Sequence, residues 1–424
     1  MYPMYDWACD LFPINRSLTG EGVRQTLRYL ADLLPGLEIH SVPSGAKAFD
    51  WTVPNEWNVR EAYIADEDGN RVIDFRNCNL HLVGYSVAVD QWMSLDELEP
   101  HLHSIPDMPG AIPYLTSYYS AYWGFCLTHD QRRTLKPGKY RVVIDSTLQP
   151  GELNYAELIL PGTEKTEVLL STYVCHPSMA NNELSGPVVT AALAKWLMTL
   201  PNRRHTYRIV FIPETIGSIV YLSRHLEHLR QSVIAGYVVT CAGDDRAYSF
   251  LASRKDGTLA DRAARHVLAA TVGTWDEYSF LDRGSDERQY CSPGVDLPVA
   301  SVMRSKYATY PEYHTSLDNL DLITPSGLAG AFDVLRRCLE VIEGNRTYRN
   351  AIPCEPQLGK RGLYPTISNH DTHAIVKTMM DLLAYCDGES DLLSVAERIG
   401  ADFTACREIA EKLAANGVLE LAAP

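Results

Sequence analysis

Several features that direct proteins to membranes or oxidising compartments are missing from this 424-residue chain. No stretch is long and apolar enough to cross a bilayer, and the first residues lack the basic and apolar segments of a signal peptide. The ten cysteines are scattered and include no C-x-x-C pair, so we expect reduced, buried thiols rather than a disulfide framework. These absences favour a cytoplasmic protein without a membrane partner.

Positive charge is scarce as well. The chain has 38 Lys and Arg against 53 Asp and Glu, a net charge of −15, which argues against binding to nucleic acids or anionic membranes. A hydrophobic content of 46% with 21% charged residues is typical of a globular protein. The length predicts two or three domains.

The most informative segment joins a strand to a helix through a polar loop. Residues 168–174 form an apolar, strand-like run, His176 follows almost at once, and residues 187–200 have the pattern of a helix. Ligands bind at the carboxyl ends of strands in open α/β sheets, and a neutral imidazole is a common metal ligand. His176 is therefore a candidate metal ligand; the alternative is a loop histidine that only hydrogen-bonds a carbonyl.

Two further strand ends carry suitable side chains. Glu214 lies just past a second apolar run, and it is either a metal ligand, a general base, or simply the first acidic residue of the helix that follows. His314 comes after a third run and an irregular loop, with Asp318 and Asp321 nearby to orient or cap. Histidines and carboxylates on separate strand-end loops are how catalytic zinc sites are assembled on parallel sheets.

Taken in chain order, these motifs resemble the zinc aminopeptidase clan, which includes bacterial leucyl aminopeptidases and glutaminyl cyclases. They resemble more closely a bacterial family of aminopeptidase-like proteins with an inserted β-rich domain and a C-terminal winged helix. The resemblance implies a zinc-aminopeptidase-like α/β domain with a mostly parallel sheet covered by helices. The motifs that carry it are CHPSMANNELSG at 175–186, PETIGS at 213–218, SDERQYC at 285–291 and YHTSLDNLD at 313–321.

The metal ligands that the resemblance implies are only partly present. The bridging aspartate of the clan falls on Asn182, with Glu183 beside it, and another clan aspartate falls on Thr240, with Asp244 and Asp245 shortly after. An amide cannot bridge two dications as a carboxylate does. We therefore expect one zinc ion rather than two, held by His176 and His314 with Asn182 or Glu183 as further candidate ligands.

The catalytic candidates are also carboxylates. The clan's Glu-Glu pair is reduced to Glu214, and its SDH motif reads Ser285-Asp286-Glu287. Glu214 is the leading candidate for the general base; if it binds the metal, Glu183 or Glu287 takes that role. Asp286 would orient the substrate's amine or a histidine.

The resulting prediction is a zinc-dependent amide or peptide hydrolase of the aminopeptidase type, acting on a small peptide or an amide-linked conjugate. Three alternatives stay open. One is an N-deacylase acting in a biosynthetic pathway, another is glutaminyl-cyclase-like acyl transfer, and the third is a binding protein whose catalytic site is degenerate.

Short apolar runs that alternate with helical patterns predict one large α/β domain with an insertion. An aromatic cluster in the insertion is read as the core of a small β-domain rather than a substrate-stacking platform; its members are Tyr118, Tyr119, Tyr122, Trp123 and Phe125. The expected domains are an α/β domain at 1–45 and 140–350, an inserted β-rich domain at 46–139 and a winged-helix-like domain at 351–424.

The C-terminal region has the helix-turn-helix pattern of a winged helix but not the charge of a DNA-binding one. Residues 355–424 contain six basic against eleven acidic residues, a net of −5. DNA binding depends on neutralising phosphates. We therefore expect no nucleic-acid partner, and a contact within the chain or with a second subunit instead.

Overall fold

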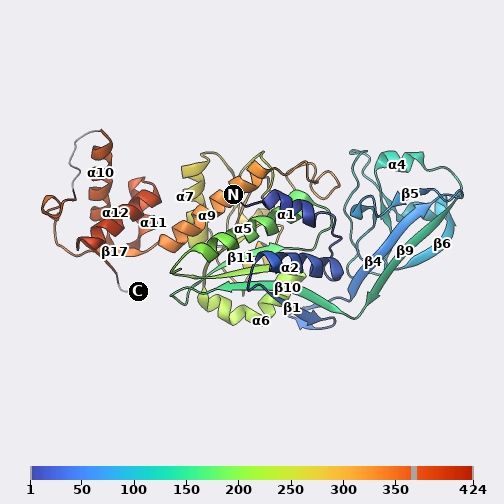
Figure 1. Ribbon diagram of the computed structural model, residues 1–424, viewed down its shortest axis with the longest axis horizontal. Coiled ribbons are helices and arrows are strands. Elements are labelled where there is room, and N and C mark those ends of the chain that lie inside the picture. Colours follow the sequence, from blue (N-terminus) through green and yellow to red (C-terminus); the bar gives the residue numbers. More distant parts are fainter. Residues whose placement is uncertain (1, 364–369, 423–424) are drawn as a thin grey trace. The chain divides into compact units, whose positions relative to one another are not determined.

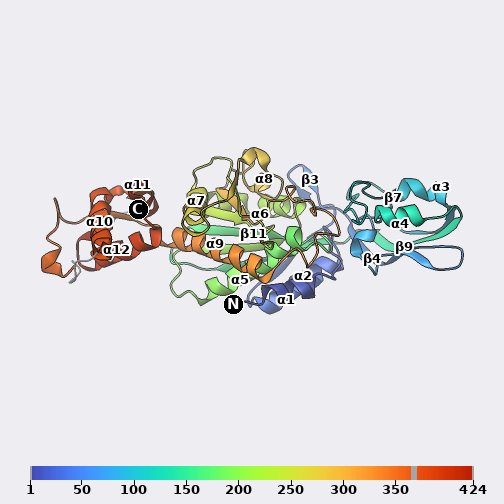
Figure 2. The same ribbon diagram turned by 90° about the horizontal axis from the view of Figure 1, so that it is seen from above.

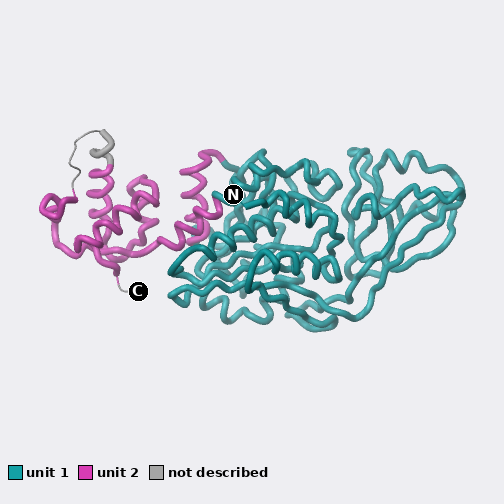
Figure 3. The backbone as a smooth tube through the Cα atoms, in the orientation of Figure 1, with its two compact units in different colours: residues 1–258, 275–333 teal, residues 259–274, 334–424 magenta. Residues whose placement is uncertain are grey.

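The computed structural model describes residues 2–363 and 370–422. The chain forms two compact units (Figure 3): unit 1 contains residues 1–258 and 275–333, and unit 2 contains residues 259–274 and 334–424. Within the described part of the chain, no helix has both the length and the apolar character needed to cross a membrane.

Unit 1 is built on an eight-stranded sheet in the order β1-β10-β12-β11-β13-β16-β14-β15. The four central strands, β12, β11, β13 and β16, run parallel to one another. Strands β1 and β10 pair antiparallel with their neighbours, and β14 pairs antiparallel with β16 but parallel with β15. The predicted α/β fold with its parallel central strands is confirmed. The strand bounds are β1 (Glu38–Pro43), β10 (Glu152–Leu160), β11 (Glu167–Tyr173), β12 (Thr206–Ile212), β13 (Val233–Val238), β14 (Ser249–Leu251), β15 (Asp276–Tyr278) and β16 (Val299–Met303).

Helices cover both faces of this sheet, which explains why its central strands are largely apolar. Every residue of β11 and β16 is buried. Figure 1 shows α5 (Ser185–Thr199) and α6 (Ile216–Ser232) on opposite faces, with α1 (Met4–Leu11) and α2 (Glu21–Leu33) on the side of α5. At Gly186 a Cβ atom would lie 2.3 Å from the Val239 carbonyl oxygen, so only glycine lets α5 begin this close to the sheet.

The predicted insertion forms a four-stranded antiparallel sheet in the order β5-β4-β9-β6 (Figure 1), and Figure 2 shows its strands β4 and β9 from above. Gly69 (φ +84°) lies in the turn that joins β4 to β5. The run from Tyr140, predicted to restart the α/β domain, is β9 and pairs with β4 and β6, so the chain returns to the large sheet only with β10. The bounds are β4 (Glu56–Ala65), β5 (Arg71–Asp74), β6 (Val89–Ser94) and β9 (Lys139–Gln149), with shorter elements β2 (Lys47–Ala48), β3 (Trp51–Thr52), α3 (Leu95–Leu98), β7 (Leu102–His103), β8 (Phe125–Cys126) and α4 (His129–Thr134).

Unit 2 contains the helices and small sheet expected of a winged helix. Its three-stranded sheet has the order β18-β17-β19, and α11 ends at Gly400 in the left-handed conformation (φ +65°). Arg262 of α7 forms ion pairs with Asp391 and Glu397 in the same unit. The bounds are α7 (Leu259–Thr271), β17 (Thr347–Asn350), α10 (His370–Tyr385), β18 (Asp387–Asp391), α11 (Leu392–Ile399), α12 (Phe403–Ala415) and β19 (Leu419–Leu421), and α9 (Pro325–Gly344) links the two units.

Candidate metal and catalytic site

Segments far apart in the sequence meet beyond the carboxyl ends of β11 and β12, around a cavity of about 260 Å³. His176, Glu214 and His314 all border it. The structure therefore brings together the three residues that the strand ends predicted. The cavity is lined by Leu18, Trp51, Tyr114, Thr116, Tyr118, Tyr119, Cys175, His176, Glu214, Thr215, Ile216, Arg288 and His314.

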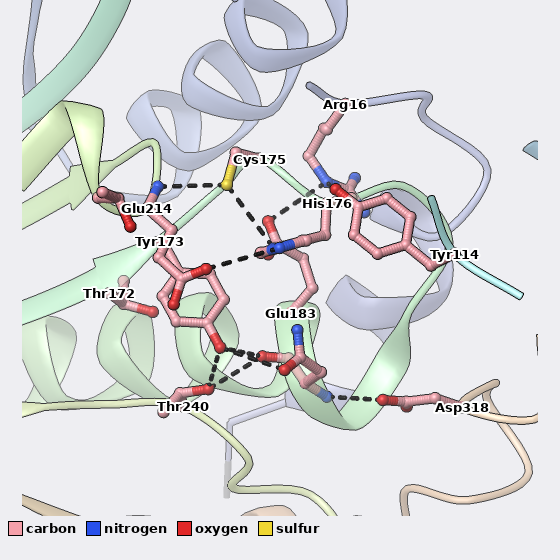
Figure 4. A network of polar contacts seen from close by, with 12 residues as sticks. Arg16, Tyr114, Thr172, Tyr173, Cys175, His176, Glu183, Glu214, Thr240 and Asp318 are labelled. Carbon is pink, nitrogen blue, oxygen red and sulfur yellow. Dashed lines mark hydrogen bonds and ion pairs between the residues drawn. The ribbon is translucent and has the colours of Figure 1, made fainter. Parts of the chain in front are cut away.

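A buried carboxylate fixes the orientation of His176 (Figure 4). The Nδ1 atom of His176 lies 2.7 Å from Glu183 Oε2. The other oxygen of this carboxylate, Oε1, lies 3.7 Å from Arg16 Nε. Burial lowers the pKa of His176, but the neighbouring Cys175 and Glu183 outweigh it and hold the pKa well above its usual value. Glu183 holds the proton on Nδ1, so a metal ion that binds His176 would displace the second proton from Nε2 and take its lone pair.

The loop that carries Asn182 and Glu183 is held by Asp318. The backbone N–H groups of Ala180, Asn181 and Asn182 all donate to this carboxylate, at 3.1, 2.6 and 3.0 Å. Burial raises the pKa of Asp318 to about 6, against the lowering effect of these amide bonds. Asp318 thus orients the loop, the role that its place in the sequence suggested.

Glu214 faces the free nitrogen of His176. Its Oε2 lies 3.6 Å from His176 Nε2, and its backbone N–H donates to Cys175 Sγ at 3.2 Å. Burial raises the pKa of Glu214, and the positive charges of His176 and Arg288 oppose this rise. A carboxylate in this position has the geometry of either a metal ligand or a general base. Either role goes beyond that of an acidic residue at the start of α6.

The turn that aims Glu214 is strained and is held in place by Asp286. Thr215 has φ +63° and ψ −75°, a rare conformation for a β-branched residue. Asp286 Oδ1 accepts from Thr215 N and from Ser218 Oγ, both at 2.8 Å, and burial together with the charge of Glu214 raises the pKa of Asp286. Asp286 therefore positions Glu214 through the backbone of the next residue.

His314 reaches the same cavity from its own loop. The centroids of the His314 and His176 rings are 5.7 Å apart, and the Tyr114 ring makes T-shaped contacts with both. Burial, with the charge of His176, lowers the pKa of His314 to about 3. His314 is therefore neutral at physiological pH, the form that binds metal ions.

The positions of the two missing clan aspartates form a neutral hydrogen-bond network. The Tyr173 hydroxyl lies 2.6 Å from Thr240 Oγ1 and donates to the Asn182 carbonyl oxygen at 2.9 Å. Asn182 Nδ2 is buried and has no hydrogen-bond partner among the described residues. Among the described residues, no carboxylate bonds to the side chains of Tyr173, Asn182 or Thr240, so these positions offer little to attract a second dication.

The other acidic candidates are engaged elsewhere. Asp244 accepts from Asn181 Nδ2 and from Ser305, and Asp245 accepts from Thr324 and Ser326. Glu287, the first residue of α8 (Glu287–Tyr290), accepts through Oε1 from Gly284 N, Ser285 N and the Tyr307 hydroxyl and does not line the cavity. These three carboxylates stabilise loops around the site.

Cys175 completes a group of possible ligand atoms on the other side of His176. The ligand atoms of Cys175, His176 and Glu183 lie within 4.8 Å of one another. The guanidinium of Arg16 is next to this group, and burial raises the pKa of the Cys175 thiol to about 11. A second cation beside Arg16 is unfavourable, which favours the Nε2 side of His176 as the metal position.

Sequence reasoning missed four residues of the site: Arg16, Tyr114, Tyr173 and Arg288. Only Arg288 had a signal, because it lies inside the SDERQYC motif. The predicted aromatic cluster divides between two roles, since Tyr118 and Tyr119 line the cavity whereas Phe125 is buried in a hydrophobic core.

Known proteins resemble the chain over nearly its whole length. Residues 5–345 match a family model described as a domain of unknown function, DUF4910, and residues 346–421 match a winged helix-turn-helix model. A Clostridium acetobutylicum protein, provisionally named a polysaccharide biosynthesis protein with an aminopeptidase-like domain, is 43% identical over 99% of this chain and 96% of its own.

Solved structures agree on the fold. A crystal structure from Clostridium acetobutylicum, provisionally described as a peptidase, has a TM-score of 0.93 with 43% identity and covers 99% of this chain and 96% of its own. A zinc aminopeptidase from Bacillus subtilis has a TM-score of 0.57 with 12% identity, covering 80% of this chain and 94% of its own. The aminopeptidase-like fold of unit 1 and the winged helix that follows it are thus both supported.

Proposed function

The chain belongs to the family described as DUF4910, and we propose that it is a zinc-dependent amide hydrolase of the aminopeptidase type. One observation carries the proposal. Two histidines more than a hundred residues apart in the sequence face one cavity with their rings 5.7 Å apart, and the Glu214 carboxylate lies 3.6 Å from His176 Nε2.

The residues around the cavity fit a zinc ion. His176 offers Nε2 because Glu183 engages its Nδ1, and His314 is kept neutral by burial. Two imidazoles and a carboxylate are a common zinc ligand set. His176 and His314 would hold the ion, with Glu214 either beside them as a ligand or free as a base, and the neutral surroundings of Asn182 favour one ion over two. A bound zinc ion would supply a water of lowered pKa and a Lewis acid for the scissile carbonyl.

The protein's own residues would transfer the proton from the attacking water to the leaving amine. As general base, Glu214 takes a proton from the attacking water and returns it to the leaving amine. Burial raises its pKa, which brings it closer to the operating pH, where a base of this kind works best. Asp286 holds the Thr215 turn that positions Glu214, and Glu183 keeps the His176 ring in place.

A panel of amides tests this function. The full-length protein, loaded with zinc or treated with a chelator, is offered aminoacyl, peptidyl and N-acyl amides, and products are identified by mass. We expect zinc-dependent hydrolysis that is lost in His176→Ala and retained in His129→Ala, a histidine outside the cavity. Loss of water or ammonia by cyclisation would indicate acyl transfer instead. A folded protein that converts none of these amides would favour the degenerate binding protein.

An N-deacylase acting on a sugar is the second candidate. The name of the Clostridium acetobutylicum relative places it in polysaccharide biosynthesis, and partly exposed aromatic side chains, Trp51 and Tyr119, line the cavity with their ring centroids 5.9 Å apart. Aromatic faces of this kind present apolar surface and polar tips to a ligand. Release of acetate from N-acetylated sugars, in preference to cleavage of peptides, would identify this activity.

A further inference from the structure

We infer that Arg288 is a specificity residue that selects substrates carrying a carboxylate. The inference rests on the proposed function, because it concerns the substrate of that same cavity. It starts from the charges that line the cavity: among the described lining residues, Arg288 is the only one with a permanent positive charge and Glu214 is the only carboxylate.

The guanidinium of Arg288 is largely unused by the protein. It donates one hydrogen bond, from Nη2 to Thr215 Oγ1 at 2.5 Å, and its buried Nε has no hydrogen-bond partner among the described residues. Arg288 also forms no ion pair with any residue that the structure describes. An arginine has five N–H donors in a fixed plane, so most of its donors remain available to a ligand.

Glu214 and Asp286 oppose the charge of Arg288 only from a distance, so the half-buried guanidinium has no direct ion pair among the described residues, and a bound anion would supply one. Carboxylates match its geometry, because the two oxygens accept two parallel N–H bonds. Thr215 holds one Nη of Arg288 at the turn that follows Glu214, so a carboxylate bound here would lie close to the general-base candidate. The substrate is then an amide that carries a carboxylate near its scissile bond.

The same charges disfavour a free ammonium group. A substrate with an unblocked amino terminus needs a carboxylate partner, and Glu214 is the only one on the cavity wall. Its distance of 3.6 Å from His176 Nε2 assigns it to the metal or the water instead. Among the amides that a hydrolase of the proposed type could cleave, N-acyl amino acids, N-blocked short peptides with a free carboxylate and N-acylated sugar acids fit the cavity better than substrates with a free amino terminus.

Paired probes that differ in one group test the inference. N-acetyl-L-phenylalanine and N-acetyl-L-phenylalaninamide are titrated into the full-length protein by calorimetry, after chelation so that no carboxylate–zinc contact contributes. We expect the parent to bind the carboxylate at least about tenfold more tightly, as a charge-assisted pair allows. Arg288→Gln should remove this preference and Arg288→Lys should retain part of it. Arg283→Gln, a neighbouring arginine outside the cavity, should keep all of it.

Two results would overturn the inference. One is a parent protein that binds both probes equally or binds neither; the other is a folded Arg288→Gln variant that keeps the full preference. Turnover is not needed for this measurement. A protein that hydrolyses no amide but prefers the carboxylate would contradict only the proposed function, whereas an active hydrolase without the preference would contradict only the role of Arg288.

Discussion

Replacing Asn182 by aspartate would restore the carboxylate at the position that bridges two metal ions in the resembling clan. Asn182 is 2% exposed, and its neighbours Tyr173 and Thr240 are neutral. Without metal, the new acid is buried beside a network that gives it no positive partner, at a cost of about 1–3 kcal/mol. At about 2–4 °C per kcal/mol, the metal-free variant should melt roughly 2–12 °C below the parent.

Zinc should reverse this loss, because a ligand at one hundred times its dissociation constant stabilises a protein by about 2.7 kcal/mol. Thermal melting of chelated and zinc-titrated protein gives both effects, and calorimetry counts the binding events. Asn202→Asp, which adds the same charge at an exposed position, should melt and titrate like the parent. An Asn182→Asp variant with unchanged metal-free stability and no added zinc event would refute the alignment of Asn182 with the bridging position.

Three other expectations concern catalysis, pH dependence and DNA. Glu214→Gln should lower turnover by about 10²- to 10⁴-fold. If the inactive variant keeps its zinc, Glu214 is the base, and if it loses zinc, Glu214 is a ligand. A variant with near-parental activity would remove Glu214 from the mechanism. Burial raises the pKa of Asp391, but Arg262 outweighs it and holds the pKa at about 2, so the pair stabilises the fold above about pH 4 and less as pH falls toward 2. Urea unfolding should show Arg262→Ala destabilised by about 1 kcal/mol at pH 7, after allowance for solvent screening, and a gap that persists at pH 2 would contradict this. Fluorescence polarisation should detect no salt-dependent, submicromolar DNA complex of the intact protein. Such a complex, if it is lost on deletion of residues 355–424, would contradict this expectation.

The parts of the fold that local patterns encode could be predicted from the sequence. β11 and β16 are short, mostly apolar runs because both faces of the sheet are covered, and Gly400 marks the end of α11. His176, Glu214 and His314 could be placed together because the carboxyl ends of parallel strands share one edge of a sheet. The error at β9 arose because a short apolar run fits either sheet, although its alternating burial is typical of a strand with one exposed face.

The supporting residues of the site could not be predicted, because they act across long sequence separations. Arg16 donates to the carbonyl of His176, 160 residues away, at 3.0 Å. Tyr114 and Tyr173 belong to segments whose composition indicates only core or strand. The role of Glu183 also depends on structure, since only the turn at 180–184 directs its carboxylate to His176 Nδ1.

Metal analysis of the purified protein tests the central claim most directly. Elemental analysis of the full-length chain, after zinc loading and removal of unbound metal, should give about one zinc per chain. The content should fall sharply in folded His176→Ala and His314→Ala variants and stay unchanged in His129→Ala. Two tightly bound ions per chain, no bound metal, or a zinc content that survives loss of both histidines would contradict a single zinc site between His176 and His314.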